Sequence, residues 1–196
     1  DILFMPYTGK ARTQPGTQQD PLSGYASYYS KDNERALPGY YEVLLKTHRT
    51  KVELTASDRV AFHRYTFPKD VEKHVMINLK DANGDDRPTD TYLEQINDTV
   101  IRGYRYSTGW SKKQQIYFSA VFSQPVHLTL YHDSVQVAGN RLQGLDVKGN
   151  VAVAPVVEEL GVKVGISPVS MENAMDNIGQ EIKDWNFENI VAETTG

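Results

Sequence analysis

In the stretch Gln115-Ile-Tyr-Phe-Ser-Ala-Val-Phe-Ser123, every second residue from Ile116 to Phe122 is apolar, and Gln115, Ser119 and Ser123 lie on the opposite side. Successive side chains of a β-strand point to opposite faces, so this alternation predicts a strand with one buried and one wetter face. Such two-sided strands are typical of antiparallel sheets, in which one face packs on a core and the other meets water.

The same period of two recurs along most of the chain. Further runs of alternating residues occur at 51–56, 60–63, 74–80, 126–130 and 162–167. Turn-forming residues stand between the runs, among them Asn83-Gly84 after the run at 74–80. Before position 168 no stretch of ten or more residues shows a helical stripe. The sequence therefore predicts an all-β fold, a large antiparallel β-sandwich.

The pattern changes to helical spacing near the C-terminal end. Ser170 can cap a helix, and the apolar residues that follow it are Met171, Ala174, Met175, Ile178 and Ile182. Residues 184–191 predict a turn into a second helix with Phe187, Ile190 and Val191 on one side. We expect a β-sandwich domain at 1–168, truncated at its N-terminus because it begins within an apolar run. We expect a helical linker at 169–196 that leads to an absent helical domain. Residues 12–33 predict an irregular surface segment.

Composition excludes several classes of function. The chain has 21 basic and 25 acidic residues and a formal net charge of −4, which gives no basic field to hold nucleic acid. It has no cysteine, which excludes disulfides, thiolate metal sites and cysteine nucleophiles. No apolar run approaches the ~20 residues that a membrane-spanning helix needs.

The common catalytic and metal motifs are absent as well. The segment Asp81-Ala-Asn-Gly-Asp-Asp86 begins like a calcium loop, but Asp86 and Tyr92 stand where that loop needs glycine and glutamate. A solvated hairpin loop is the better interpretation. Hydrolysis of a glycoside requires two carboxylates at a defined separation, and sequence spacing alone cannot choose such a pair from 25 acidic residues. We therefore name no catalytic and no metal-binding residue in this chain.

One aromatic segment, residues 101–110, offers candidate binding residues. It carries Tyr104, Arg105 and Trp110 beside two glycines. Sugars bind by stacking on aromatic rings and by hydrogen bonds to planar groups such as guanidinium. The alternative is that the rings pack in the sandwich or at a domain interface, which is where large rings usually lie. Tyr104, Arg105 and Trp110 are thus predicted to bind carbohydrate or to form a domain interface, and we favour the second role.

Several segments, taken in order, resemble glycoside hydrolase family 92. They are Asp1-Ile-Leu-Phe-Met-Pro-Tyr-Thr-Gly9, Ala36-Leu-Pro-Gly-Tyr-Tyr-Glu-Val-Leu-Leu45, Arg59-Val-Ala-Phe-His-Arg-Tyr-Thr-Phe-Pro68, Ile101-Arg-Gly-Tyr-Arg-Tyr-Ser-Thr-Gly-Trp110, Ile116-Tyr-Phe-Ser-Ala-Val-Phe-Ser123, Val162-Lys-Val-Gly-Ile-Ser167, Ser170-Met-Glu-Asn-Ala174 and Trp185-Asn-Phe187. The resemblance covers nearly the whole chain, which makes it more specific than any single motif.

The resemblance implies both a fold and a function. Family 92 comprises calcium-dependent, inverting exo-α-mannosidases, many of which trim α-1,2-linked mannose from N-glycans. The family has an N-terminal supersandwich similar to galactose mutarotase, followed by an (α/α)6 barrel that holds the acid, the base and most calcium ligands. This chain is then expected to be the non-catalytic N-terminal domain of a bacterial α-mannosidase that is secreted, periplasmic or bound to the cell surface. It would pack on the barrel and wall part of the cleft for mannose-containing glycans.

Two other classes of function remain open. A free-standing carbohydrate-binding module would bind mannose saturably with a change in tryptophan fluorescence. A purely structural or adhesive sandwich would neither bind sugar nor restore activity to a partner domain. Similarity of fold alone cannot choose between these classes.

Overall fold

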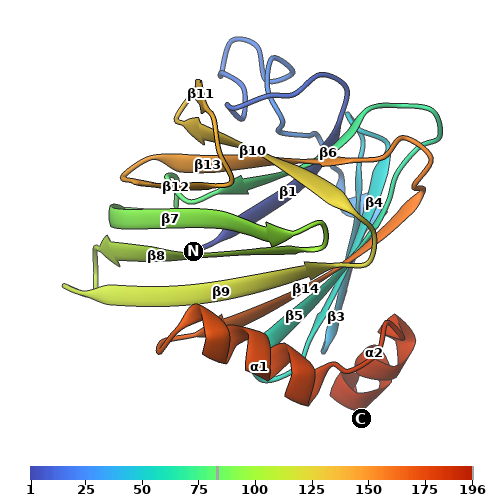
Figure 1. Ribbon diagram of the computed structural model, residues 1–196. Coiled ribbons are helices and arrows are strands. Elements are labelled where there is room, and N and C mark those ends of the chain that lie inside the picture. The colour runs from blue at the N-terminus through green and yellow to red at the C-terminus, as the bar shows by residue number, and fades with distance from the viewer. Residues whose placement is uncertain (83, 196) are drawn as a thin grey trace.

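The computed structural model describes residues 1–82 and 84–195, which form two antiparallel sheets followed by two helices (Figure 1). One sheet has the strand order β1 (Leu3–Thr8), β6 (Lys73–Asn78), β13 (Val147–Val153), β10 (Val126–His132), β11 (Val135–Val137). The other has the order β12 (Arg141–Gly144), β7 (Arg87–Asn97), β8 (Val100–Thr108), β9 (Gln114–Phe122), β14 (Glu159–Ser167), β5 (Val60–Thr66), β4 (Thr50–Ala56), β3 (Tyr40–Leu45), β2 (Glu34–Leu37). The predicted antiparallel β-sandwich is confirmed. The Asn83 half of the predicted turn and the chain end at Gly196 lie outside the described residues.

The main core lies between the two sheets and is built from alternate residues of each strand. In β9, Phe118, Ala120 and Phe122 are at most 1% exposed and belong to this core. Ser119 points to the other face, where its Oγ donates a hydrogen bond of 2.7 Å to the carbonyl oxygen of Met171. The alternation that predicted this strand is thus confirmed, and its polar face contacts a helix.

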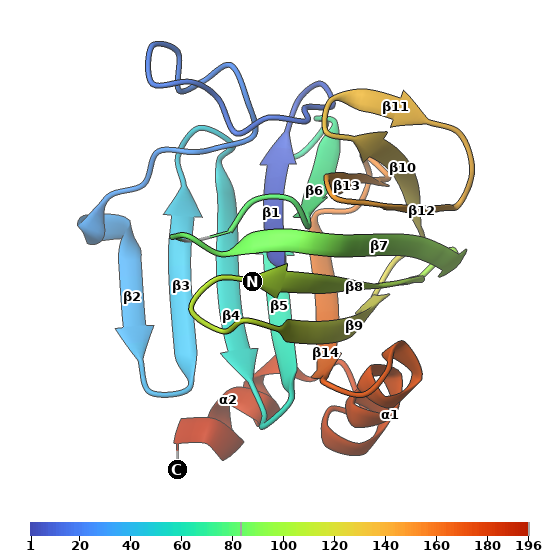
Figure 2. The ribbon, with the colours of Figure 1, turned by 90° about the vertical axis from the view of Figure 1, so that its left-hand side faces the viewer.

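The strand β14 joins the two halves of the larger sheet. It pairs with β9 on one side and with β5 on the other, although it is the last strand of the chain. Its residues Val162 and Val164 belong to the main core, and Lys163 alternates with them. In Figure 2 the sheet turns from the upright strands β2 to β5 into the roughly horizontal strands β7 to β9, with β14 between the two groups.

Both predicted helices are present, and they cover the outer face of the larger sheet. Helix α1 (Met171–Glu181) begins at Ser170, whose Oγ accepts a hydrogen bond of 3.0 Å from the backbone N–H of Asn173. Helix α2 (Phe187–Thr195) follows after a short turn. A second core forms here from Val60, Phe62, Ile178, Ile182, Phe187 and Ile190. A side chain at Gly165 would place its Cβ 2.1 Å from the carbonyl oxygen of Ala174, so α1 packs directly on the backbone of β14.

The outer face of the smaller sheet is more buried than the sequence pattern predicted. Every residue of β6 is buried, including His74 and Asn78, so the wetter face predicted for 74–80 is wrong for the strand. The reason is a long irregular connection from Gly9 to Ser30, which crosses this face and buries Tyr25 against Tyr7 and Met76. The irregular segment predicted at 12–33 is confirmed, apart from the single 3-10 turn η1 (Lys31–Asn33).

The helices are short compared with a bilayer. Within the described residues, no helix is both long enough and apolar enough to cross a membrane.

The second core predicts that the helices are part of the folded unit. Phe187 is 2% exposed, and replacing it with alanine should lower the free energy of unfolding by about 3–5 kcal/mol, the usual loss for a buried phenylalanine. The matched control is Val156→Ala, which removes an 85% exposed side chain and should change stability by less than about 0.5 kcal/mol. Urea unfolding measures both. Equal losses at the two positions would show that α2 does not stabilise the sandwich.

Candidate functional site

The three residues singled out by sequence lie in or just after β8, but the structure does not bring them together in one site. Tyr104 and Arg105 are neighbours in the strand, so their side chains point to opposite faces of the sheet. Tyr104 lies on the outer face, Arg105 is 1% exposed, and Trp110 lies in the connection between β8 and β9 with its side chain fully exposed (105%).

Tyr104 is the middle member of a row of tyrosine rings. Its ring stacks on Tyr92 and Tyr106, with centroid separations of 5.4 Å and 4.4 Å. The Tyr104 hydroxyl donates to Asp90 Oδ2 at 3.0 Å, and the hydroxyls of Tyr106 and Tyr117 are 2.5 Å apart. Burial and the hydrogen bond to Asp90 raise the pKa of Tyr104. Since Tyr104 is only partly exposed and already stacks on two neighbouring rings, it offers a sugar little open ring surface.

Arg105 is a buried guanidinium that holds an acidic side chain. Its Nε donates to the carbonyl oxygen of Leu79 at 2.9 Å, and its Nη1 forms an ion pair with Asp86. Its Nη2 has no hydrogen-bond partner among the described residues. Burial by itself raises the pKa of Asp86, but hydrogen bonds from Arg105 and Ser107 outweigh it and lower that pKa. Asp86 therefore remains ionised at neutral pH.

Trp110 and Asp86 line the same open hollow of about 820 Å³. The other lining residues are Asp85, Arg87, Thr108 and Gly109. Gly109 allows the close approach, because a Cβ at this position would lie 3.0 Å from the Cα of Asp86. Two of the three sequence candidates are thus connected, since Arg105 positions Asp86 and Asp86 lies beside Trp110. Sequence reasoning gave Asp85 and Asp86 no role beyond a solvated loop.

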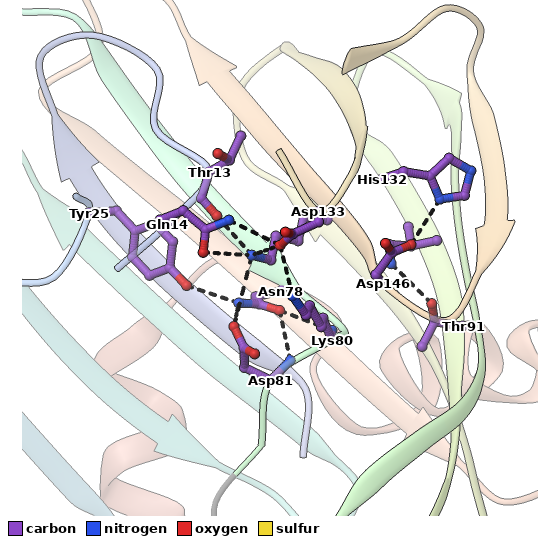
Figure 3. Close-up of polar contacts among 12 residues, drawn as sticks. Thr13, Gln14, Tyr25, Asn78, Lys80, Asp81, Thr91, His132, Asp133 and Asp146 are labelled. Atoms are coloured by element: carbon purple, nitrogen blue, oxygen red, sulfur yellow. Dashed lines mark hydrogen bonds and ion pairs between the residues drawn. The ribbon is translucent and has the colours of Figure 1, made fainter. Parts of the chain in front are cut away.

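A second polar cluster lies on the outer face of the smaller sheet (Figure 3). Asp133 Oδ1 accepts from Lys80 Nζ, Lys148 Nζ and Gln14 Nε2 at 3.0, 2.9 and 3.0 Å. Lys148 is fully buried and also donates to the carbonyl oxygen of Thr13 at 2.9 Å. These contacts tie the irregular segment 9–30 to β13 and to the β10–β11 turn. The cluster therefore has a clear role in folding.

A third cluster gathers acidic residues on the outer face of β3 and β4. Glu42 and Glu53 both contact Lys51, and the Tyr40 hydroxyl lies within hydrogen-bonding distance of both, at 2.5 Å from Glu42 Oε2 and 2.8 Å from Glu53 Oε1. Arg64 donates to both carboxylate oxygens of Glu53, at 3.0 and 2.9 Å. Burial alone would raise the pKa of Glu53, but these partners outweigh it and lower the pKa to about 2. A general acid in glycoside hydrolysis needs the opposite shift.

Comparison with known proteins assigns the fold to a family. The family model described as the glycosyl hydrolase family 92 N-terminal domain matches residues 1–167. The chain belongs to glycosyl hydrolase family 92. The resemblance inferred from the sequence motifs is thereby confirmed.

Solved structures of family 92 enzymes share this fold over the whole chain. A family 92 α-mannosidase from Bacteroides thetaiotaomicron is 31% identical, with TM-scores of 0.93 and, in complex with mannoimidazole, 0.92. Both structures cover 100% of this chain, which spans 27% of theirs. A family 92 inverting mannosidase from B. thetaiotaomicron VPI-5482, at 19% identity and a TM-score of 0.80, covers 98% of this chain and shares the fold; this chain spans 25% of it. No curated protein matches the chain.

The Asp133 cluster predicts an acid-sensitive attachment of the irregular segment. Hydrogen bonds from Gln14, Lys148 and Lys80 lower the pKa of Asp133 in the folded chain. Its stabilising effect should be complete above the unfolded value of about 3.9 and should weaken as pH falls below it. Asp133→Asn should make residues 9–30 more susceptible to limited proteolysis at pH 7. Asp98→Asn, at an exposed turn, is the control. Equal protection in both variants would show that Asp133 does not hold the segment.

Proposed function

We propose that this chain is the non-catalytic N-terminal domain of an α-mannosidase. It packs on a separate catalytic domain, an (α/α)6 barrel, and walls part of the cleft that binds mannose-containing glycans. The observation that carries the proposal is the match of the whole chain to an α-mannosidase nearly four times its length, of which this chain spans 27%. The remaining length of such an enzyme has room for the catalytic domain.

The state of the acidic side chains supports the non-catalytic role. Inverting hydrolysis needs a protonated carboxyl group as acid and an ionised one as base, with the two groups about 6.5–9.5 Å apart. Among the described residues, every carboxyl group whose pKa is clearly displaced has a lowered pKa: Glu42, Glu53, Asp86, Asp133, Glu172, Glu181 and Glu188. Groups of this kind are ionised at neutral pH and are poor proton donors. The acid would therefore come from the partner domain.

We propose that the full enzyme binds calcium and that the ligands lie mainly outside this chain. In the described part of the chain, no three His, Cys, Asp or Glu side chains come together to hold a metal ion. The best-formed acidic group, Glu42 with Glu53, is neutralised by Lys51 and Arg64. We therefore place the calcium ligands mainly in the catalytic domain and assign this chain no metal-dependent step.

The finer parts of the proposal concern the substrate and its location. We include α-1,2-linked mannose of N-glycans as the substrate and export to the periplasm or cell surface as the location. The substrate accords with the formal net charge of −4, which offers no basic field for a polyanion and suits a protein that meets neutral glycans.

Activity assays test the division of roles. The purified chain with added calcium should release no mannose from an α-linked mannobiose, and combining it with the catalytic domain should give hydrolysis. In the combined enzyme, Glu42→Gln should leave kcat within about threefold, whereas loss of a general acid or base typically costs ~10²–10⁴ in rate. Release of mannose by the chain alone, or a loss of that size for Glu42→Gln, would show that catalysis resides here.

A further inference from the structure

We infer that the hollow beside Trp110 binds a hexose unit of a glycan, with Trp110 as the stacking surface and Asp85, Asp86 and Arg87 as hydrogen-bonding groups. The nature of the hexose, mannose, rests on the proposed function, but the site itself rests on the geometry of this chain. This assigns the contact between the domain and the glycan to named side chains of this chain, which the proposed function leaves open.

The exposure of Trp110 is the first support. Tryptophan is usually well buried, but this side chain is fully exposed (105%), so its ring is open to a ligand. An indole ring packs well on the apolar C–H face of a pyranose, because the ring presents a broad apolar surface. The row of rings around Tyr104 lacks this property, since the tyrosines there cover one another.

The polar groups of the hollow are the second support. Among the described residues, the exposed side chains of Asp85 and Arg87 make no hydrogen bond or ion pair, so their oxygen and nitrogen atoms can serve a ligand. Asp86 is fixed by Arg105, which is itself anchored on Leu79. Carboxylate and guanidinium groups are planar and bidentate, and they match pairs of neighbouring hydroxyls on a sugar ring.

The charged side chains that line the hollow favour a sugar over a protein domain or a polyanion as its ligand. A protein domain that covered the hollow would have to bury Asp85 and Arg87, and charged groups are depleted from the cores of interfaces because their desolvation is costly. A polyanion would meet two carboxylates in a chain of net charge −4. A neutral, hydroxyl-rich ligand satisfies the polar groups without either cost. The hollow of about 820 Å³ also lies within the ~300–1,000 Å³ range of small-molecule sites.

Sugar titration of the isolated chain tests the site, because no catalytic partner is needed. The probes are α-linked mannotriose and, for comparison, maltotriose. The chain has two tryptophans, so Trp185→Phe leaves Trp110 as the sole indole reporter and serves as the matched control. Mannotriose should change the fluorescence of this variant saturably, with a dissociation constant on the order of 1 mM. Binding measured by calorimetry should weaken at least about tenfold in Trp110→Ala and in Asp86→Asn, each checked for native stability.

Three outcomes would overturn the inference. The first is the absence of saturable binding by either sugar, and the second is undiminished binding in Trp110→Ala. The third is self-association of the chain through Trp110 without sugar binding, which would make the loop a protein contact. None of these outcomes bears on the proposed role beside a catalytic domain, which the hydrolysis assay tests separately.

Discussion

The pairing of β14 with both β9 and β5 is the constraint on which the rest of the structure depends. It joins the hairpins before residue 67 to those after residue 86 in one continuous sheet. Its inward residues Val162 and Val164 complete the main core, and its outward side carries Lys163 and the backbone at Gly165 on which α1 rests. Because this strand comes last among the strands, the larger sheet is not complete until nearly the whole chain has been placed, and the contacts involved are long-range.

Local sequence patterns predicted the parts of the fold that depend on local geometry. The alternation in β9 and the spacing of apolar residues after Ser170 each follow from one strand or one helix, and both are confirmed. The outer face of β6 could not be predicted in this way. Asn78 is polar, yet it is buried because Tyr25, which lies 53 positions earlier in the chain, covers it and accepts its hydrogen bond. No period of two encodes such a contact, since it depends on where a distant irregular segment crosses the sheet.

The candidate site shows the same limit. Neighbouring residues of a strand point to opposite faces, so the sequence alone could predict that the side chains of Tyr104 and Arg105 are separated by the sheet. The ion pair between Arg105 and Asp86 could not be predicted from the sequence. It depends on the register of β7 against β8, which brings Arg87 opposite Thr108. The loop that resembled a calcium-binding motif instead supplies a carboxylate held by a buried arginine. Its function is set by a neighbouring strand and not by its own spacing.

Basic side chains explain the lowered pKa of three carboxylates in this sandwich. Lys148 and Arg105 are buried and each binds a carboxylate, while Arg64 binds Glu53 at the edge of the helical layer. A buried cation without any partner would be costly, and Lys148 and Arg105 each meet this cost with an ionised carboxylate. Each of these pairings, like that of Arg64 with Glu53, lowers the pKa of the carboxylate. The same pairs that fasten the loops and helices to the sheets therefore remove these groups from use as general acids. Protonation of a leaving oxygen requires a carboxyl group in a different environment, one whose burial is not offset by a neighbouring cation.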